Sequence, residues 1–151
     1  MPYKIYEQKG WLSLCEGNIV NTGDVVAWLL SLYNQYELYP LMVGYDKWSS
    51  DYLVHELQAN GFQIDDVRQG TNLTPVINEA EALLKDGRLQ SGDQNDLMKI
   101  HMLDSAVQQY ADSGLRKLVK VNKRCHIDGM AALLDALCVR QKYWDQFGYQ
   151  L

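Results

Sequence analysis

The chain has 151 residues, of which 47% are hydrophobic and 22% charged, and its formal net charge is −5. These values are typical of one globular domain, so we expect a single domain over residues 1–151. They exclude a disordered tail, a collagen-like fibre and a coiled-coil rod. The longest apolar run, residues 25–33, is far shorter than the roughly 20 residues that cross a bilayer, so we expect no membrane segment.

The termini and cysteines indicate a cytoplasmic protein. Residues 1–7 contain no apolar stretch typical of a signal peptide. The three cysteines, Cys15, Cys125 and Cys138, are an odd number without C-x-x-C spacing. We interpret them as reduced thiols rather than a disulfide framework or a zinc site.

The predicted elements alternate between helices and strands over most of the chain. The first four are a helical turn at 3–9, a strand at 11–15, a helix from 25 to 36 that Thr22 caps, and a strand at 41–46. A helix follows that Ser49 or Ser50 caps and Asn60-Gly61 ends. The last two are a strand at 62–67 and a helix at 74–86 with Thr74 as N-cap. Strand, helix and strand in this order predict parallel pairing through right-handed crossovers.

The last third of the chain is less regular. A short helix is expected at 97–103, and Asp112-Ser113-Gly114 predicts a hairpin between strands at 107–111 and 115–121. A final helix begins near Asp128 and ends at about residue 144. Because it is apolar on most sides, we expect it to be buried.

Although the net charge of the chain is negative, one segment is basic. Five basic side chains fall within residues 116–124, namely Arg116, Lys117, Lys120, Lys123 and Arg124. An acidic protein is not expected to bind nucleic acid non-specifically, but a local basic cluster can still contact phosphates. Two interpretations remain open for Lys117, Lys120, Lys123 and Arg124: contact with the DNA backbone, which their position before Asp128 favours, or a solvated strand face.

Two acidic residues are candidates for chemistry because of their positions. Asp46 ends an apolar strand, at the edge of an α/β sheet where ligands usually bind. Asp128 begins the last helix, and its neighbour Gly129 would allow another backbone to approach closely. Each has a structural alternative: Asp46 as a turn residue, and Asp128 as a partner of the helix dipole.

Four segments together are similar to a known family. They are VGYDKW at 43–48, DVRQG at 66–70, MKIH at 98–101 and RCHIDGMAAL at 124–133. In this order they resemble the C-terminal nuclease domain of tailed-phage terminase large subunits, over about residues 3–137. The resemblance implies a ribonuclease H-like α/β fold: a mixed sheet flanked by helices, truncated at its N-terminus, with an added hairpin toward the C-terminus.

The resemblance also implies an activity, the metal-dependent cutting of concatemeric viral DNA during packaging. The G-Y-D-x-W and I-D-G-x-x-A-L patterns of the family each supply one metal-binding acid, here Asp46 and Asp128. Two Mg²⁺ or Mn²⁺ ions about 3.5–4 Å apart suit phosphodiester hydrolysis, and such hard ions prefer carboxylate oxygens. The family's third acid lies on a strand before residue 3, and neither it nor a P-loop is found in this sequence.

Other titratable residues are weaker candidates. Asp135 follows Asp128 by seven residues, about 10.5 Å along a helix axis, so the two are too far apart to share one ion. We expect a structural or solvent-facing role for Asp135. His126 is a candidate to orient a metal-bound water or contact phosphate, whereas His55 and His101 are expected to be ordinary helix-face residues.

The resemblance implies double-stranded viral DNA, the terminase small subunit and the portal as partners, in the cytoplasm of the bacterial host. A different possibility is a non-catalytic assembly fragment of a prophage protein, which forms a homo-oligomer through the open edge of the 41–46 strand. Another ribonuclease H-like enzyme, such as a resolvase, fits fewer of the segments.

Overall fold

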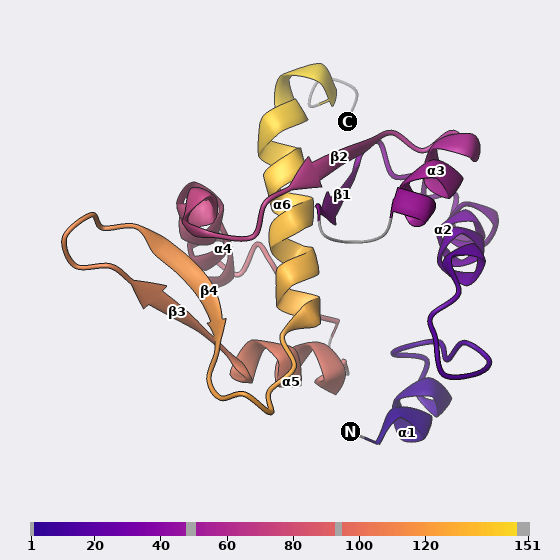
Figure 1. The fold of residues 1–151 in the computed structure, drawn as a ribbon, viewed down its shortest axis with the longest axis horizontal. Coiled ribbons are helices and arrows are strands. Elements are labelled where there is room, and N and C mark those ends of the chain that lie inside the picture. Colours follow the sequence, from indigo (N-terminus) through magenta and orange to yellow (C-terminus); the bar gives the residue numbers. More distant parts are fainter. Residues whose placement is uncertain (1, 48–50, 93–94, 148–151) are drawn as a thin grey trace. The chain divides into compact units, whose positions relative to one another are not determined.

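The computed structural model describes residues 2–47, 51–92 and 95–147. The predicted caps Ser49 and Ser50, and Trp48 of the family pattern, lie outside these ranges. The chain forms two compact units, one of residues 1–43 and 48–65 and the other of residues 44–47 and 66–151 (Figure 1). Within the described ranges, no helix combines the length and apolar character needed to cross a membrane.

The first unit is helical. It contains α1 (Tyr3–Gln8), α2 (Thr22–Tyr36) and α3 (Asp51–Ala59). Asn21, and not Thr22, caps α2, because its side chain accepts a hydrogen bond from the Gly23 N–H at 2.9 Å. The predicted stop of α3 is confirmed: Gly61 follows the helix with a φ of +84°, a conformation that glycine adopts without strain.

The core of this unit forms where α2 meets α3. Buried Val26, Leu57 and Phe62 lie at its centre, and five half-buried residues pack around them: Leu29, Leu30, Val43, Leu53 and Ile64. The strand predicted at 11–15 is wrong, since these residues have no regular structure. Trp11 instead packs its ring against the buried Tyr6, at 5.7 Å between centroids. The apolar side chain of Trp11 is therefore packed although residues 11–15 form no strand.

Two short strands begin in the first unit and end in the second. They are β1 (Val43–Asp46) and β2 (Ile64–Val67). The Val43 N–H donates to the Gln63 carbonyl at 2.8 Å and the Lys47 N–H donates to the Val67 carbonyl at 3.3 Å. The pairing advances in the same direction along both strands, so they are parallel, as the strand–helix–strand order predicts.

The second unit contains the remaining elements. They are η1 (Thr71–Leu73), α4 (Thr74–Lys85), α5 (Asp96–Leu103), β3 (Ser105–Gln109), β4 (Arg116–Lys120) and α6 (Asp128–Phe147). The predicted hairpin is confirmed: β3 and β4 pair antiparallel, with Ser105 opposite Lys120 and Gln109 opposite Arg116. In the described ranges this hairpin and β1–β2 are separate two-stranded sheets.

The long helix α6 organises the core of the second unit, packing against α4 and α5. Buried apolar residues come from several elements: Val67, Leu73, Val76, Ile77, Ala80, Cys125, Met130, Leu134, Leu137 and Val139. The helix begins at Asp128 as predicted but is not buried all round, because Ala132, Ala136 and Arg140 are exposed. Cys15, Cys125 and Cys138 are free thiols.

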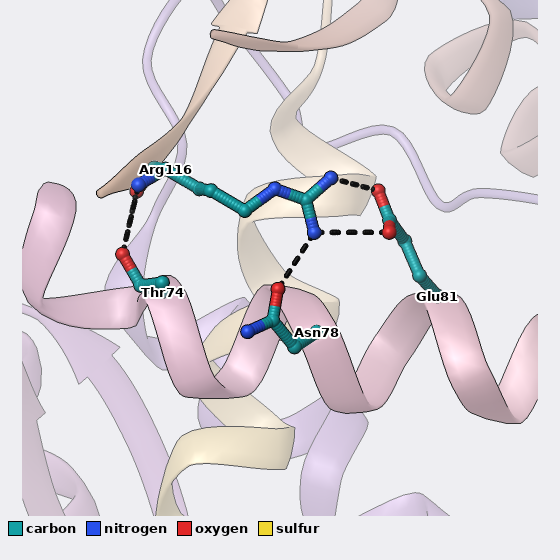
Figure 2. A network of polar contacts seen from close by, with 4 residues as sticks. All are labelled: Thr74, Asn78, Glu81 and Arg116. Carbon is teal, nitrogen blue, oxygen red and sulfur yellow. Dashed lines mark hydrogen bonds and ion pairs between the residues drawn. The ribbon is translucent and has the colours of Figure 1, made fainter. Parts of the chain in front are cut away.

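A polar network attaches the hairpin to α4 (Figure 2). The Thr74 hydroxyl accepts the Arg116 N–H at 2.9 Å, and the Arg116 guanidinium donates to Asn78 at 2.7 Å and to both oxygens of Glu81. The guanidinium holds the pKa of Glu81 below its usual range. Thr74 is therefore not the predicted N-cap, since it lies inside α4 and its hydroxyl holds β4.

Candidate metal-binding site

Strand β1 crosses α6 at very short range. A Cβ atom placed on Gly44 would lie 2.6 Å from the carbonyl oxygen of Asp135 and 3.0 Å from Cγ1 of Val139. The first distance is shorter than real Cβ contacts, so only glycine fits here. Because side chains alternate along a strand, Asp46 lies on the same strand face as Gly44. The close contact thus brings Asp46 to the Asp135 region of α6.

Asp135 is the acid that the structure places beside Asp46. It is 6% exposed, and burial together with the charge of Asp46 raises the pKa of Asp135 to about 6. The Gln69 side-chain amide donates a hydrogen bond to Oδ1 of Asp135, which works in the opposite direction. Of the two roles expected for Asp135, structural or solvent-facing, the solvent-facing one is wrong, because the side chain is buried where β1 packs on the helix.

Asp128 has the opposite surroundings. It is the first residue of α6, its side chain is 80% exposed, and its Oδ2 lies 3.8 Å from Nδ1 of His126. From Asp128 to Asp135 the helix advances two turns, about 10.5 Å along its axis. In Figure 1, β1 runs alongside α6 toward the N-terminal half of that helix. The residues of α6 that Gly44 meets, Asp135 and Val139, lie two turns or more beyond Asp128.

The start of α6 is held by His101 of α5 and by Asp104, which follows that helix. The Gly129 N–H donates to Nδ1 of His101 at 2.7 Å, and the His126 N–H donates to Asp104 at 3.1 Å. A Cβ on Gly129 would lie 2.8 Å from Nδ1 of His101. Gly129 therefore admits an imidazole and not a second backbone. His101 lies on helix α5, as expected, and it accepts a hydrogen bond there that the sequence did not predict. His55 is exposed on α3, as expected.

The donor atoms suit a hard divalent cation. Asp46, Asp128 and Asp135 offer carboxylate oxygens, the ligands that Mg²⁺ and Mn²⁺ prefer. A cation between Asp46 and Asp135 would also relieve the repulsion between their charges. In the described part of the chain, no group of three or more His, Cys, Asp and Glu residues forms a preassembled metal cage. The site fits such an ion through few protein ligands, as Mg²⁺ usually requires.

The four basic DNA candidates are exposed and fall in two neighbouring segments of the chain. Lys117 and Lys120 lie on β4, where the alternation of side chains directs them to opposite faces. Lys123 and Arg124 lie in the connection from β4 to α6, where the Arg124 N–H donates to the Asn122 side chain at 2.9 Å. The second pair lies next to Asp128 in the chain.

Residues 1–142 match the family model described as the endonuclease domain of the terminase large subunit, and the chain belongs to this family. The predicted family and the ribonuclease H-like fold class are thereby confirmed. No curated protein matches the chain.

Two solved structures show the same fold. The large terminase of bacteriophage HK97 superposes with a TM-score of 0.76 at 25% identity, over 91% of this chain and 29% of that one. The large terminase nuclease of thermophilic phage G20c superposes with a TM-score of 0.62 at 20% identity, over 81% of this chain and 64% of that one. The chain thus spans less than two thirds of either protein.

Proposed function

We propose that this chain cuts double-stranded phage DNA in a metal-dependent reaction during packaging, with Asp46 and Asp128 as metal ligands. The observation that supports this proposal is the packing of β1 on α6, which brings Asp46 to the helix whose first residue is Asp128. Membership of the terminase endonuclease family supplies the reaction class.

Each site residue has a role in this proposal. Bound Mg²⁺ or Mn²⁺ would supply a nucleophile at neutral pH and stabilise the charge on the leaving oxygen. Asp46 and Asp128 hold the ions, and His126, 3.8 Å from Asp128, orients the attacking water or contacts the phosphate. Four exposed basic residues neutralise DNA phosphates: Lys117, Lys120, Lys123 and Arg124.

The partners proposed for the whole terminase follow from the family. They are the terminase small subunit and the portal, in the cytoplasm of the bacterial host. Because the chain corresponds to 29% of the HK97 large terminase, these contacts belong to a longer assembly in this proposal.

Metal titration combined with DNA cleavage tests the proposed function. Asp46→Asn and Asp128→Asn should each weaken Mn²⁺ binding and lower Mn²⁺-dependent cleavage of double-stranded DNA by about 100-fold or more, because each removes a ligand charge. Asp145→Asn is the matched control, since Asp145 is an exposed acid near the other end of α6. Equal Mn²⁺ binding by wild type and Asp46→Asn would remove Asp46 from the site.

A second candidate function is non-catalytic assembly. In the described ranges β1 and β2 form a two-stranded sheet, so each strand has only one neighbour, and open strand edges promote association. This function predicts a homodimer or larger oligomer in light scattering, together with no metal-dependent cleavage. A monomer at high concentration would count against it.

A further inference from the structure

We propose that Asp135 is an additional metal ligand, which binds the same cation as Asp46 from the middle of α6. This inference rests on the proposed metal-dependent nuclease function and extends its site. The family pattern assigns its helix acid to Asp128, at the exposed start of α6. Asp135, two turns further along, is assigned from its own position in this fold.

A close backbone contact brings the segments that carry the two acids together. Gly44 brings β1 so close to α6 that a Cβ atom would meet the carbonyl oxygen of Asp135 at 2.6 Å. Asp46, two residues further along β1, lies on the same face of that strand. A contact between main chains cannot adjust as a flexible side chain can, so the packing of β1 on α6 keeps Asp46 near the Asp135 turn of the helix.

Asp135 is a buried acid that lies close to a second acid, Asp46. The side chain is 6% exposed and experiences the charge of Asp46. The side-chain amide of Gln69 that donates to Asp135 is neutral, so this bond orients the carboxylate and adds no positive charge beside it. Buried carboxylates are costly unless they are paired or coordinate a metal, and a divalent cation would serve both acids at once.

The geometry also separates Asp135 from Asp128. The two lie about 10.5 Å apart along the helix axis, too far for one ion with ligand distances of about 2.1 Å. Asp135 therefore shares an ion with Asp46 and not with Asp128. Gln69 is a positioning residue in this arrangement, because it holds the plane of the Asp135 carboxylate.

Mn²⁺ titration of the whole chain, by calorimetry and by the electron paramagnetic resonance signal of free Mn²⁺, tests this role. Asp135→Asn should weaken Mn²⁺ binding at least tenfold and remove the rise in melting temperature that Mn²⁺ gives the wild type. Asp145→Asn should behave as wild type. Gln69→Leu should weaken binding less than Asp135→Asn does, because it removes only the group that orients the ligand. Equal losses from the two substitutions would indicate an indirect role of Asp135 and would overturn the inference.

The failures of the two proposals are distinguishable. If Asp46→Asn and Asp128→Asn lose Mn²⁺ but Asp135→Asn binds it as wild type does, the inference is wrong and the proposed function stands. If the wild type binds no Mn²⁺, both are wrong.

A measurement on the wild-type chain does not depend on the folding of any variant. Substoichiometric Mn²⁺ should broaden the NMR signals of the Gln69 side-chain amide, because that amide donates directly to Asp135. The signals of Gln109, at the far end of β3 next to the hairpin turn, should stay sharp. Equal broadening of Gln69 and Gln109, or none at Gln69, would contradict a site at Asp135.

Discussion

The two acids in the first half of α6 belong to the same helix and have opposite surroundings. Asp128 is 80% exposed at the start of the helix, whereas Asp135 is 6% exposed under β1. Asp128 is accessible to DNA and solvent, while Asp135 is held in a position where its charge is costly without a cation. The comparison shows that two acids only two turns apart on one helix can differ in exposure: one is open to solvent, and the other is held in place by the strand that packs on it.

Different neighbours hold the two acids in place. At the exposed end, an imidazole from α5 accepts the N–H of Gly129 and can rotate if it is disturbed. At the buried end, the backbone of β1 at Gly44 touches the backbone of α6 at Asp135. We therefore expect substitutions at the buried end to have the larger effects.

The largest effect should come from Gly44→Ala, which disrupts the contact between β1 and α6 at Asp135. The added methyl group would collide with the Asp135 carbonyl, so we expect a loss of about 2–3 kcal/mol in the free energy of unfolding, with weaker Mn²⁺ binding. Urea denaturation measures the change. Gly92→Ala is the control, because nothing lies within 4 Å of its added Cβ, and it should stay within about 0.5 kcal/mol. Equal stabilities of the two variants would contradict the close contact.

The pH dependence of stability should separate the two acids without metal. Since folding raises the pKa of Asp135 to about 6, its contribution is fully present below the unfolded pKa and is lost as the pH rises through about 6. In EDTA, Asp135→Asn should therefore become more stable than the wild type as the pH rises above 6, with a difference that approaches about 3 kcal/mol.

Thermal unfolding at several pH values measures this difference. Asp128→Asn is the control, because its side chain is 80% exposed, and it should follow the wild-type profile within about 0.5 kcal/mol. A profile of Asp135→Asn parallel to that of the wild type would show that Asp135 is not desolvated in the folded chain.

A smaller effect is expected from Gly129→Ala, which disturbs the exposed end. The added Cβ would lie 2.8 Å from Nδ1 of His101 and displace the ring, with the loss of the hydrogen bond from the Gly129 N–H. We expect a loss of about 1 kcal/mol in the free energy of unfolding. His101→Asn, which retains an acceptor near this position, should lose less in the same urea titration. An unchanged midpoint for Gly129→Ala would contradict the contact.

The smallest effect concerns the basic residues beside the exposed acid. Lys123→Gln removes one proposed phosphate contact, so the slope of log affinity against log salt should become shallower by about 0.9. Fluorescence anisotropy with double-stranded DNA at several salt concentrations measures the slope. Lys85→Gln, at the end of α4, removes the same charge elsewhere and should leave the slope unchanged. Equal slopes for both variants would remove Lys123 from the DNA-binding surface.

Local signals in the sequence predict several parts of this fold. The hairpin follows from a glycine at the end of its turn, and the end of α3 from Asn60-Gly61. The start of α6 at Asp128 agrees with the apolar pattern that follows it. Each of these features is specified by residues that are close together in the sequence, so it can be predicted from the sequence alone.

The features that the sequence does not predict depend on contacts between distant segments. Asp135 has the spacing of an ordinary helix residue, and only the crossing of β1 at Gly44 shows that it is buried beside Asp46. The role of His101 depends on Gly129, which is far from it in the chain. A glycine within a short apolar strand, as at Gly44, was the available signal for a close backbone approach.

Anomalous diffraction from Mn²⁺-soaked crystals of this chain tests the central claim most directly. The account predicts a manganese peak within about 2.5 Å of carboxylate oxygens of both Asp46 and Asp135. Ordered manganese that contacts neither residue, or these two side chains directed away from each other, would contradict it.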